Sequence, residues 1–211
     1  MIPLLHDFAG ATVLVFGGGR VGARKARRFA REARVVVVSP TFEGAFGADV
    51  ALVRAAPGAE MVDALVERAD PALVVAATDD AAVNEAAAAA ARDAGALVNR
   101  ADRSGDRDAG SVVVPATVRD DPVVVAVATG GRSPALSRHL RERFEEDVEG
   151  AGAMAELTAA LRTDLRERGV DADRRREAVR AVVRSTPVWK ALRAGDTKAR
   201  REAESVIEEY L

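Results

Sequence analysis

The chain has 211 residues, of which 48% are hydrophobic and 30% charged, and its formal net charge is −2. This length allows one or two small domains with buried cores, and the near-neutral charge gives no overall attraction to nucleic acid. Cysteine is absent, which excludes disulfides, a thiol nucleophile and thiolate metal ligands. The N-terminal stretch "MIPLLHDFAG" is too polar at its end for a signal peptide, and the apolar runs are too short to span a membrane. We therefore expect a cytoplasmic protein without a membrane segment.

Residues 12–99 alternate between short apolar runs and segments of helical periodicity. The apolar runs are typical of parallel strands buried on both faces, and we expect them at residues 13–16, 35–38, 51–54, 73–76 and 97–99. Helices are expected at residues 21–31, 61–69 and 80–94, the last capped by Asp79 or Asp80 and ended by Gly95. This alternation predicts an α/β domain of the Rossmann type, with a doubly wound parallel sheet.

The pattern changes after Asn99. A polar loop leads to two β runs, "SVVVPATV" and "PVVVAVAT", which the turn-forming stretch "RDDP" joins into a hairpin. From Ser133 onward the sequence reads as helical, with two or three shorter helices after the first and breaks near residues 169–171, 185–187 and 195–196. We expect three parts: a nucleotide-binding domain (1–111), a dimerisation segment of hairpin plus helix (112–150) and a helical C-terminal domain (151–211).

The stretch "GGGRVG" fits the pattern G-x-G-x-x-G with Gly17, Gly19 and Gly22. It follows the first strand and opens a helix, which is the context that such a fingerprint requires. Gly17 would permit a tight turn, Gly19 the approach of a pyrophosphate, and Gly22 close packing of helix on strand. The helix N-terminus would offer N–H groups to phosphates. The alternative is a glycine turn without a ligand.

The second strand lacks the acidic residue that commonly binds the ribose of a dinucleotide. It ends in "VVVVSPTF", without a carboxylate. Either backbone groups with Ser39 or Thr41 meet the ribose, or the dinucleotide carries a 2′-phosphate that Arg20 or Arg24 contacts. The spacing of residues does not separate these two possibilities.

Several stretches taken together resemble the precorrin-2 dehydrogenase family, which includes the N-terminal part of siroheme synthases. They are "VFGGGRVGARKARRF", "VVAATDDAAVNEAA", "VNRAD", "SVVVPATV" and "VAVATGGRSPALSRHLRE", in this order over about the first 145 residues. The resemblance implies oxidation of precorrin-2, a polycarboxylate tetrapyrrole, to sirohydrochlorin with NAD. It also places Arg20, Val21, Pro40 and Thr41 at positions that contact the dinucleotide.

Asp102 in "VNRAD" is the candidate catalytic residue, because it matches the aspartate of that family and follows the fifth strand. Removal of a hydride from the tetrapyrrole requires removal of a proton, which a carboxylate can take. A loop aspartate that caps a turn is the alternative, and Asp106 and Asp108 lie in the same loop.

Three further residues lie at or just after the ends of strands. Asn99 could contact nicotinamide or orient Asp102, or it could be an ordinary strand-end asparagine. Thr78 and Asp79 are expected to line the cofactor site, with helix capping as the alternative.

The stretch "TGGRSP" is a second glycine turn that leads into a helix. Its N–H groups and side chains could hold carboxylates of the substrate, or it could be an ordinary capped helix start. The candidate substrate-binding residues are Thr129, Gly130, Gly131, Arg132 and Ser133. Additional arginines for a polyanionic substrate are Arg100, Arg103, Arg107 and Arg138, although each alone reads as a surface residue.

We expect no metal site, because His6 and His139 are the only histidines and lie far apart in the sequence. A bifunctional enzyme that also inserts Fe²⁺ into sirohydrochlorin is one alternative function. A non-catalytic NAD-sensing module is another. The chain is too short to include the methyltransferase half of a full siroheme synthase, so the substrate is expected to come from a separate enzyme.

We expect a homodimer built through residues 112–150. An isolated hairpin is marginal in water and its edges invite pairing with a second chain. The alternative is that the hairpin extends the sheet of its own subunit and the protein is a monomer.

Overall fold

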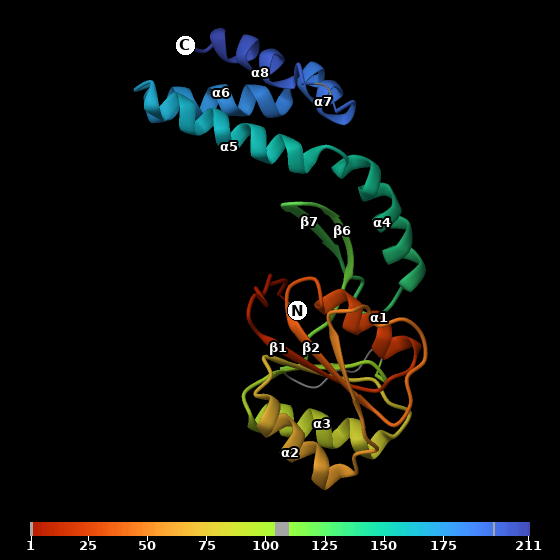
Figure 1. Cartoon of the computed structure of the whole chain (residues 1–211). Coiled ribbons are helices and arrows are strands. Elements are labelled where there is room, and N and C mark those ends of the chain that lie inside the picture. The colour runs from red at the N-terminus through yellow and green to blue at the C-terminus, as the bar shows by residue number, and fades with distance from the viewer. Residues whose placement is uncertain (1, 104–109, 196) are drawn as a thin grey trace. The chain divides into compact units, whose positions relative to one another are not determined.

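A computed structural model describes residues 2–103, 110–195 and 197–211. The chain divides into two compact units, Met1–Val114 and Pro115–Leu211. Figure 1 shows the α/β unit in red to green and the unit with the hairpin and later helices in green to blue.

The first unit contains a five-stranded sheet whose neighbouring strands are all parallel. Its strands are β1 (Thr12–Phe16), β2 (Arg34–Ser39), β3 (Val50–Arg54), β4 (Leu73–Ala76) and β5 (Leu97–Arg100). The order across the sheet is β3-β2-β1-β4-β5. The predicted Rossmann-type sheet is confirmed, and the strand order reverses between β1 and β4, where such folds bind their ligands.

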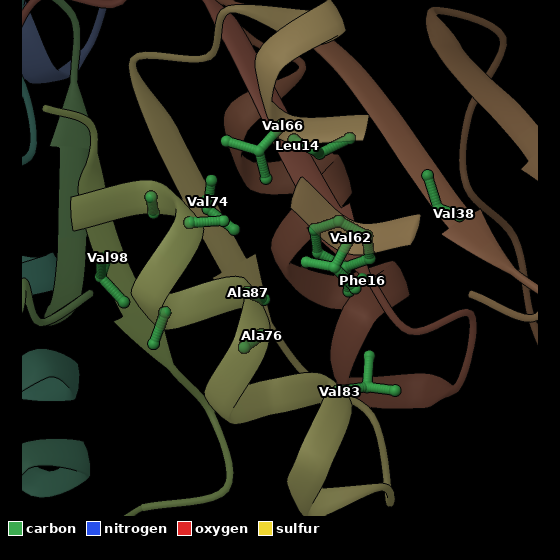
Figure 2. Close-up of a cluster of buried hydrophobic side chains, with 13 residues drawn as sticks. Leu14, Phe16, Val38, Val62, Val66, Val74, Ala76, Val83, Ala87 and Val98 are labelled. Atoms are coloured by element: carbon green, nitrogen blue, oxygen red, sulfur yellow. The ribbon is translucent and has the colours of Figure 1, made fainter. Parts of the chain in front are cut away.

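Side chains of successive strand residues lie on opposite faces of the sheet and pack in two different hydrophobic clusters. This is expected for a sheet covered on both faces. Val13 and Val15 pack in one cluster with residues of α1 (Arg20–Phe29). Leu14 and Phe16 pack in the other, with α2 (Ala59–Ala69) and α3 (Ala81–Asp93). Figure 2 shows this second cluster between the sheet and the two helices.

The segment after the sheet differs from the expected continuous strand over "SVVVPATV". Ser111 forms a parallel bridge with Val98, and the Val112 N–H donates to the Val98 carbonyl at 2.7 Å. Pro115 has no N–H to continue such pairing. The antiparallel strand β6 (Ala116–Asp120) begins directly after it.

The second unit begins with the predicted hairpin of β6 and β7 (Val123–Val127), which are antiparallel neighbours. The hairpin forms its own two-stranded sheet rather than an extension of the five-stranded one. The helix α4 (Pro134–Val148) packs on both strands. The carboxylate of Asp120, the last residue of β6, accepts from the Gly152 N–H at 3.0 Å. This bond joins the hairpin to the helix that follows α4.

Within the described residues the predicted breaks separate four helices after α4, so the expected number of two or three was too low. They are α5 (Ala151–Glu167), α6 (Ala172–Arg184), α7 (Thr186–Arg193) and α8 (Ala199–Glu208). Gly169 and Gly195 adopt positive φ at two of the breaks, with residue 196 outside the described residues. Side chains of all four helices, including Leu165, Val182 and Val188, form one core. No helix of the described residues is long and apolar enough to cross a membrane.

Candidate functional site

The loops that follow β1, β2, β4 and β5 lie at the same edge of the parallel sheet, the carboxyl edge. These loops, the ends of the strands before them and the first turn of the following helix α1 carry all the predicted cofactor-binding residues and Asp102. The residues of "TGGRSP" belong to the second unit.

Close packing explains two glycines of the fingerprint and a third beside them. A Cβ on Gly17, whose φ is +116°, would lie 2.3 Å from the Ala77 carbonyl oxygen after β4. A Cβ on Gly22 would lie 2.0 Å from the Gly17 carbonyl oxygen. A Cβ on Gly18, a position the sequence analysis did not single out, would lie 2.1 Å from the Thr41 carbonyl oxygen. These contacts seat the turn against its neighbours, where any side chain would collide.

Gly19 has a different environment, because a Cβ there would meet no atom of the described residues within 4 Å. Its φ of −75° is open to any residue. Gly19 is also the N-cap of α1, and no side chain caps this helix. The backbone and the described packing therefore do not require glycine at this position. A small residue beside uncapped N–H groups suits an approaching phosphate.

The two residues that follow Gly19, at the start of α1, are also accessible. Arg20 is exposed, and Val21 is 39% exposed although its side chain is apolar. Gly22 is buried beneath them. The first two residues of the helix are therefore accessible, whereas the next two, Gly22 and Ala23, are buried.

The loop after β2 is tied to the glycine turn. The Gly17 N–H donates to the Val38 carbonyl at 3.0 Å, and the Glu43 N–H donates to the Gly18 carbonyl at 2.8 Å. Ser39 is buried at the end of β2, whereas Pro40 and Thr41 are exposed. This loop thus brings Ser39, Pro40 and Thr41, all predicted to contact the dinucleotide, to the glycine turn.

A charged side chain from the neighbouring strand β3 contacts the carbonyl of Pro40. Arg54 donates from Nη1 to the Pro40 carbonyl at 2.9 Å, and its guanidinium lies over the Phe42 ring. The Arg54 guanidinium therefore already contacts the loop after β2.

The loop after β4 is held by Asn84, a residue of α3 that is only 1% exposed. Its Oδ1 accepts from the Thr78 N–H at 3.1 Å and from the Thr78 hydroxyl at 2.9 Å. Its Nδ2 donates to the Thr78 carbonyl at 2.8 Å. Asp80 is the N-cap, accepting from the Ala82 and Val83 N–H groups, which leaves Asp79 exposed beside it. Sequence reasoning missed Asn84, although its place one turn after the cap was visible.

Asn99 carries an unpartnered buried atom. The residue is 5% exposed, and its Nδ2 donates to the Val112 carbonyl at 2.7 Å. Its Oδ1 has no hydrogen-bond partner among the described residues. A buried acceptor without a partner is costly, so this oxygen suits a donor that the chain itself does not provide.

Asp102 is held in a bidentate ion pair by Arg100, the last residue of β5. Arg100 donates from Nε to Oδ1 at 2.9 Å and from Nη2 to Oδ2 at 2.7 Å. The third nitrogen, Nη1, donates to Glu85 of α3 at 2.8 Å. Arg103 also donates to Glu85, at 3.1 Å. The Arg100 side chain is 6% exposed and that of Asp102 is 26% exposed.

This pairing keeps Asp102 ionised. The hydrogen bonds from Arg100 lower the pKa of the Asp102 carboxyl, partial burial raises it, and the Asn84 side chain lowers it further. The net effect is a pKa below the ordinary value for aspartate. The rival candidates Asp106 and Asp108, and also Arg107, lie outside the described residues.

The turn at "TGGRSP" forms a capped helix start. The Ser133 hydroxyl accepts from the Leu136 N–H at 3.2 Å, and the Thr129 hydroxyl donates to the Ser133 carbonyl at 3.0 Å. Gly130 and Gly131 adopt positive φ, and Arg132 is exposed. The two hydroxyls are thus engaged locally, which leaves the Arg132 side chain as the group best placed to meet an anion.

Within the described residues there is no group of three or more His, Cys, Asp or Glu side chains that could hold a metal ion. The His6 ring contacts the Phe8 ring in a tilted arrangement, with ring centroids 4.4 Å apart, and His139 is exposed on α4.

Comparison with known proteins identifies related chains. A family model described as "Putative NAD(P)-binding" matches residues 4–116. A siroheme synthase of Stutzerimonas stutzeri (strain A1501) is 36% identical over 215 residues, which cover 100% of this chain and 44% of the relative. A precorrin-2 dehydrogenase of Methanosarcina barkeri (strain Fusaro / DSM 804) is 31% identical over 220 residues, which cover 100% of this chain and 95% of the relative.

The solved structure of SirC, precorrin-2 dehydrogenase, has the same fold. It superimposes with a TM-score of 0.70 at 24% sequence identity and covers 100% of both chains. This chain spans less than half the length of the siroheme synthases that it matches, and nearly the whole length of the Methanosarcina dehydrogenase. The full-length match, together with the matched NAD(P)-binding region, shows that the chain belongs to the precorrin-2 dehydrogenase family.

Proposed function

We propose that this chain oxidises precorrin-2 to sirohydrochlorin with NAD. One observation carries the proposal: an ionised aspartate stands at the same edge of the sheet as a helix N-terminus that Gly19 leaves open. The similarity to a precorrin-2 dehydrogenase of nearly equal length supports the choice of substrate. The proposal keeps the cytoplasmic location that we expect from the sequence.

The first unit fits a dinucleotide. Gly17, Gly19, Arg20, Val21 and Gly22 would hold the pyrophosphate through the first turn of α1. The residues proposed for the ribose are Ser39, Pro40 and Thr41. Those proposed for the nicotinamide side of the site are Thr78, Asp79 and Asn99. The unpartnered Asn99 Oδ1 supports this assignment, because a carboxamide N–H would satisfy it.

We expect NAD rather than NADP. The Arg54 guanidinium, next to the ribose-side loop, already contacts Pro40 and Phe42. A 2′-phosphate is commonly bound by arginines, often through paired hydrogen bonds. The loop itself, residues 39–41, carries no charged side chain.

Oxidation of precorrin-2 must remove a proton as well as a hydride. When bound, NAD supplies the hydride acceptor. The chain supplies the proton acceptor, and we assign this role to the Asp102 carboxylate, which is ionised and partly exposed. Its fixed bidentate partner limits the directions in which it can face.

The substrate carboxylates require positive groups and N–H donors. We propose Thr129, Gly130, Gly131, Arg132 and Ser133 for this role. The exposed Arg132 and the two glycines with positive φ support it. Thr129 and Ser133 would act by shaping the turn, since their hydroxyls are engaged within it.

We also propose a homodimer through the dimerisation segment, residues 112–150, between the NAD-binding domain (1–111) and the helical C-terminal domain (151–211). In the part of the chain that the structure describes, no third strand pairs with β6 or β7. Both outer edges of the hairpin therefore remain open to a strand of a second chain. A symmetric contact between two copies would use the same segment twice.

Anaerobic incubation with precorrin-2 and either dinucleotide, followed by absorbance, tests the proposed reaction. We expect the spectrum of sirohydrochlorin to appear with NAD and faster than with NADP. Equal or faster turnover with NADP would contradict the cofactor preference. Binding of NAD without turnover would instead favour a sensing module.

Gly19→Asp is expected to abolish NAD binding while the fold is retained, because the new carboxylate would occupy and repel the pyrophosphate. The matched control is Gly58→Asp. Gly58 caps α2 with φ −78° and ψ 173°, close to the −75° and −177° of Gly19, and it also faces open space. Aspartate is favourable at an N-cap, so both variants should unfold no earlier than the parent protein. Calorimetry that finds unchanged NAD affinity in Gly19→Asp refutes the assignment of the turn.

Asp102→Ala is expected to lower turnover by about 10²- to 10⁴-fold, the usual contribution of general acid–base catalysis. NAD affinity should change little, since the pyrophosphate is assigned to a different loop. Asp63→Ala, which removes an exposed carboxylate of α2, is the control and should leave turnover unchanged. Near-parent turnover of Asp102→Ala together with loss in Asp106→Ala would move the catalytic role to the other aspartate.

Light scattering tests the dimer. At micromolar concentration we expect a mass of twice the 22.2 kDa of one chain. A mass equal to one chain would rule the dimer out.

A further inference from the structure

Arg100 is an interior arginine rather than a surface one. Its side chain is 6% exposed, and each of its three nitrogens donates to a carboxylate of the chain itself. Two of these bonds go to Asp102 and one goes to Glu85. A guanidinium already engaged on all three nitrogens is poorly suited to take a carboxylate of the substrate. Its role therefore depends on the two residues that it holds, Asp102 and Glu85.

We propose that Arg100, anchored to α3 by Glu85, is a positioning residue that holds the Asp102 carboxylate as an anion in one orientation. This inference rests on the catalytic role proposed above for Asp102. The guanidinium and the carboxylate form two parallel N–H···O bonds, which fix the plane of the carboxylate as well as its distance.

The anchor comes from a rigid element. Glu85 lies on α3, and its carboxylate accepts from Arg100 at 2.8 Å and from Arg103 at 3.1 Å. The next residue toward the N-terminus, Asn84, holds the Thr78 loop. Two adjacent residues of one helix thus fix the loop after β4 and the last residue of β5.

The charges around Asp102 nearly cancel. The ion pairs join Asp102, Arg100, Glu85 and Arg103, two anions and two cations, and Arg92 of α3 adds a more distant positive charge near Glu85. Arg100 and the Asn84 side chain lower the pKa of Asp102, and Arg100 also lowers that of Glu85. Both carboxylates therefore remain charged well into the acidic range.

This arrangement suits the proposed reaction in a particular way. Loss of a hydride makes the tetrapyrrole more positive, and a fixed anion nearby stabilises that charge without having to reorient. The paired carboxylate is a weaker base than a free one, and it stays ionised to lower pH. Arg100 thus lowers the basicity of the Asp102 carboxylate, but it fixes the position of that carboxylate and keeps its negative charge near the substrate.

The inference is tested by titrating the Asp102 carboxyl carbon by NMR in the free protein, without substrate or cofactor. In the parent protein we expect a pKa below the ordinary aspartate value. In Arg100→Gln it should rise, and in Arg100→Lys, which keeps a cation but not the paired bonds, it should rise less. Arg200→Gln removes an arginine that pairs with Asp164 and Glu204 in the helical part, and it should leave the titration of Asp102 unchanged.

Turnover gives a second readout. Since the paired state keeps Asp102 ionised to lower pH, the acidic limb of the rate profile should move to higher pH in Arg100→Lys. At neutral pH we expect kcat to fall by about 10²-fold from misplacement alone, with NAD affinity unchanged. If the Asp102 titration is the same in the parent, Arg100→Lys and Arg100→Gln, all folded by circular dichroism, the inference is overturned. That titration needs no turnover, so its failure is separate from failure of the proposed reaction.

Discussion

No side chain fits between the turn after β1 and the end of β4. The arrangement of the loops at the carboxyl edge of the sheet depends on this close approach. A Cβ at Gly17 would collide with the Ala77 carbonyl, and one at Gly22 would collide with Gly17. The turn can therefore pass directly from β1 into α1 while β1 and β4 remain hydrogen-bonded neighbours. The result is a helix N-terminus at the point where the strand order reverses, which is where α/β sheets bind ligands.

The helix α3 provides the second constraint. Asp80 caps it, Asn84 binds the Thr78 loop, and Glu85 binds Arg100. Because these side chains follow one another on a helix packed into the core, the loops they hold are fixed by the same rigid element. The candidate catalytic carboxylate is thus placed by packing and ion pairing, and its charge state follows from the same contacts.

Much of this could be predicted from the sequence, because the apolar runs and the glycine fingerprint are local signals. The five strands, the hairpin and the breaks between the helices follow from such signals, although Pro115 shortened the expected strand over residues 111–118. The roles of Asn84 and Arg100 could not be predicted in this way. A polar residue in a helix and an arginine at a strand end are both ordinary on a surface, and only tertiary packing brings Arg100 beside Glu85, fifteen residues before it in the chain. For "TGGRSP" the sequence offered a capped helix start as one of two readings, and the hydroxyls of Thr129 and Ser133 are used within that turn.

The central claim is that NAD binds at the open N-terminus of α1 and extends toward Asn99. An amide NMR titration of the full chain with NAD tests this most directly. The account predicts saturable shifts of the backbone amides of residues 19–22 and of the Asn99 side-chain amide, with little change in α5–α8. Saturable binding that leaves residues 19–22 and Asn99 unshifted would contradict it.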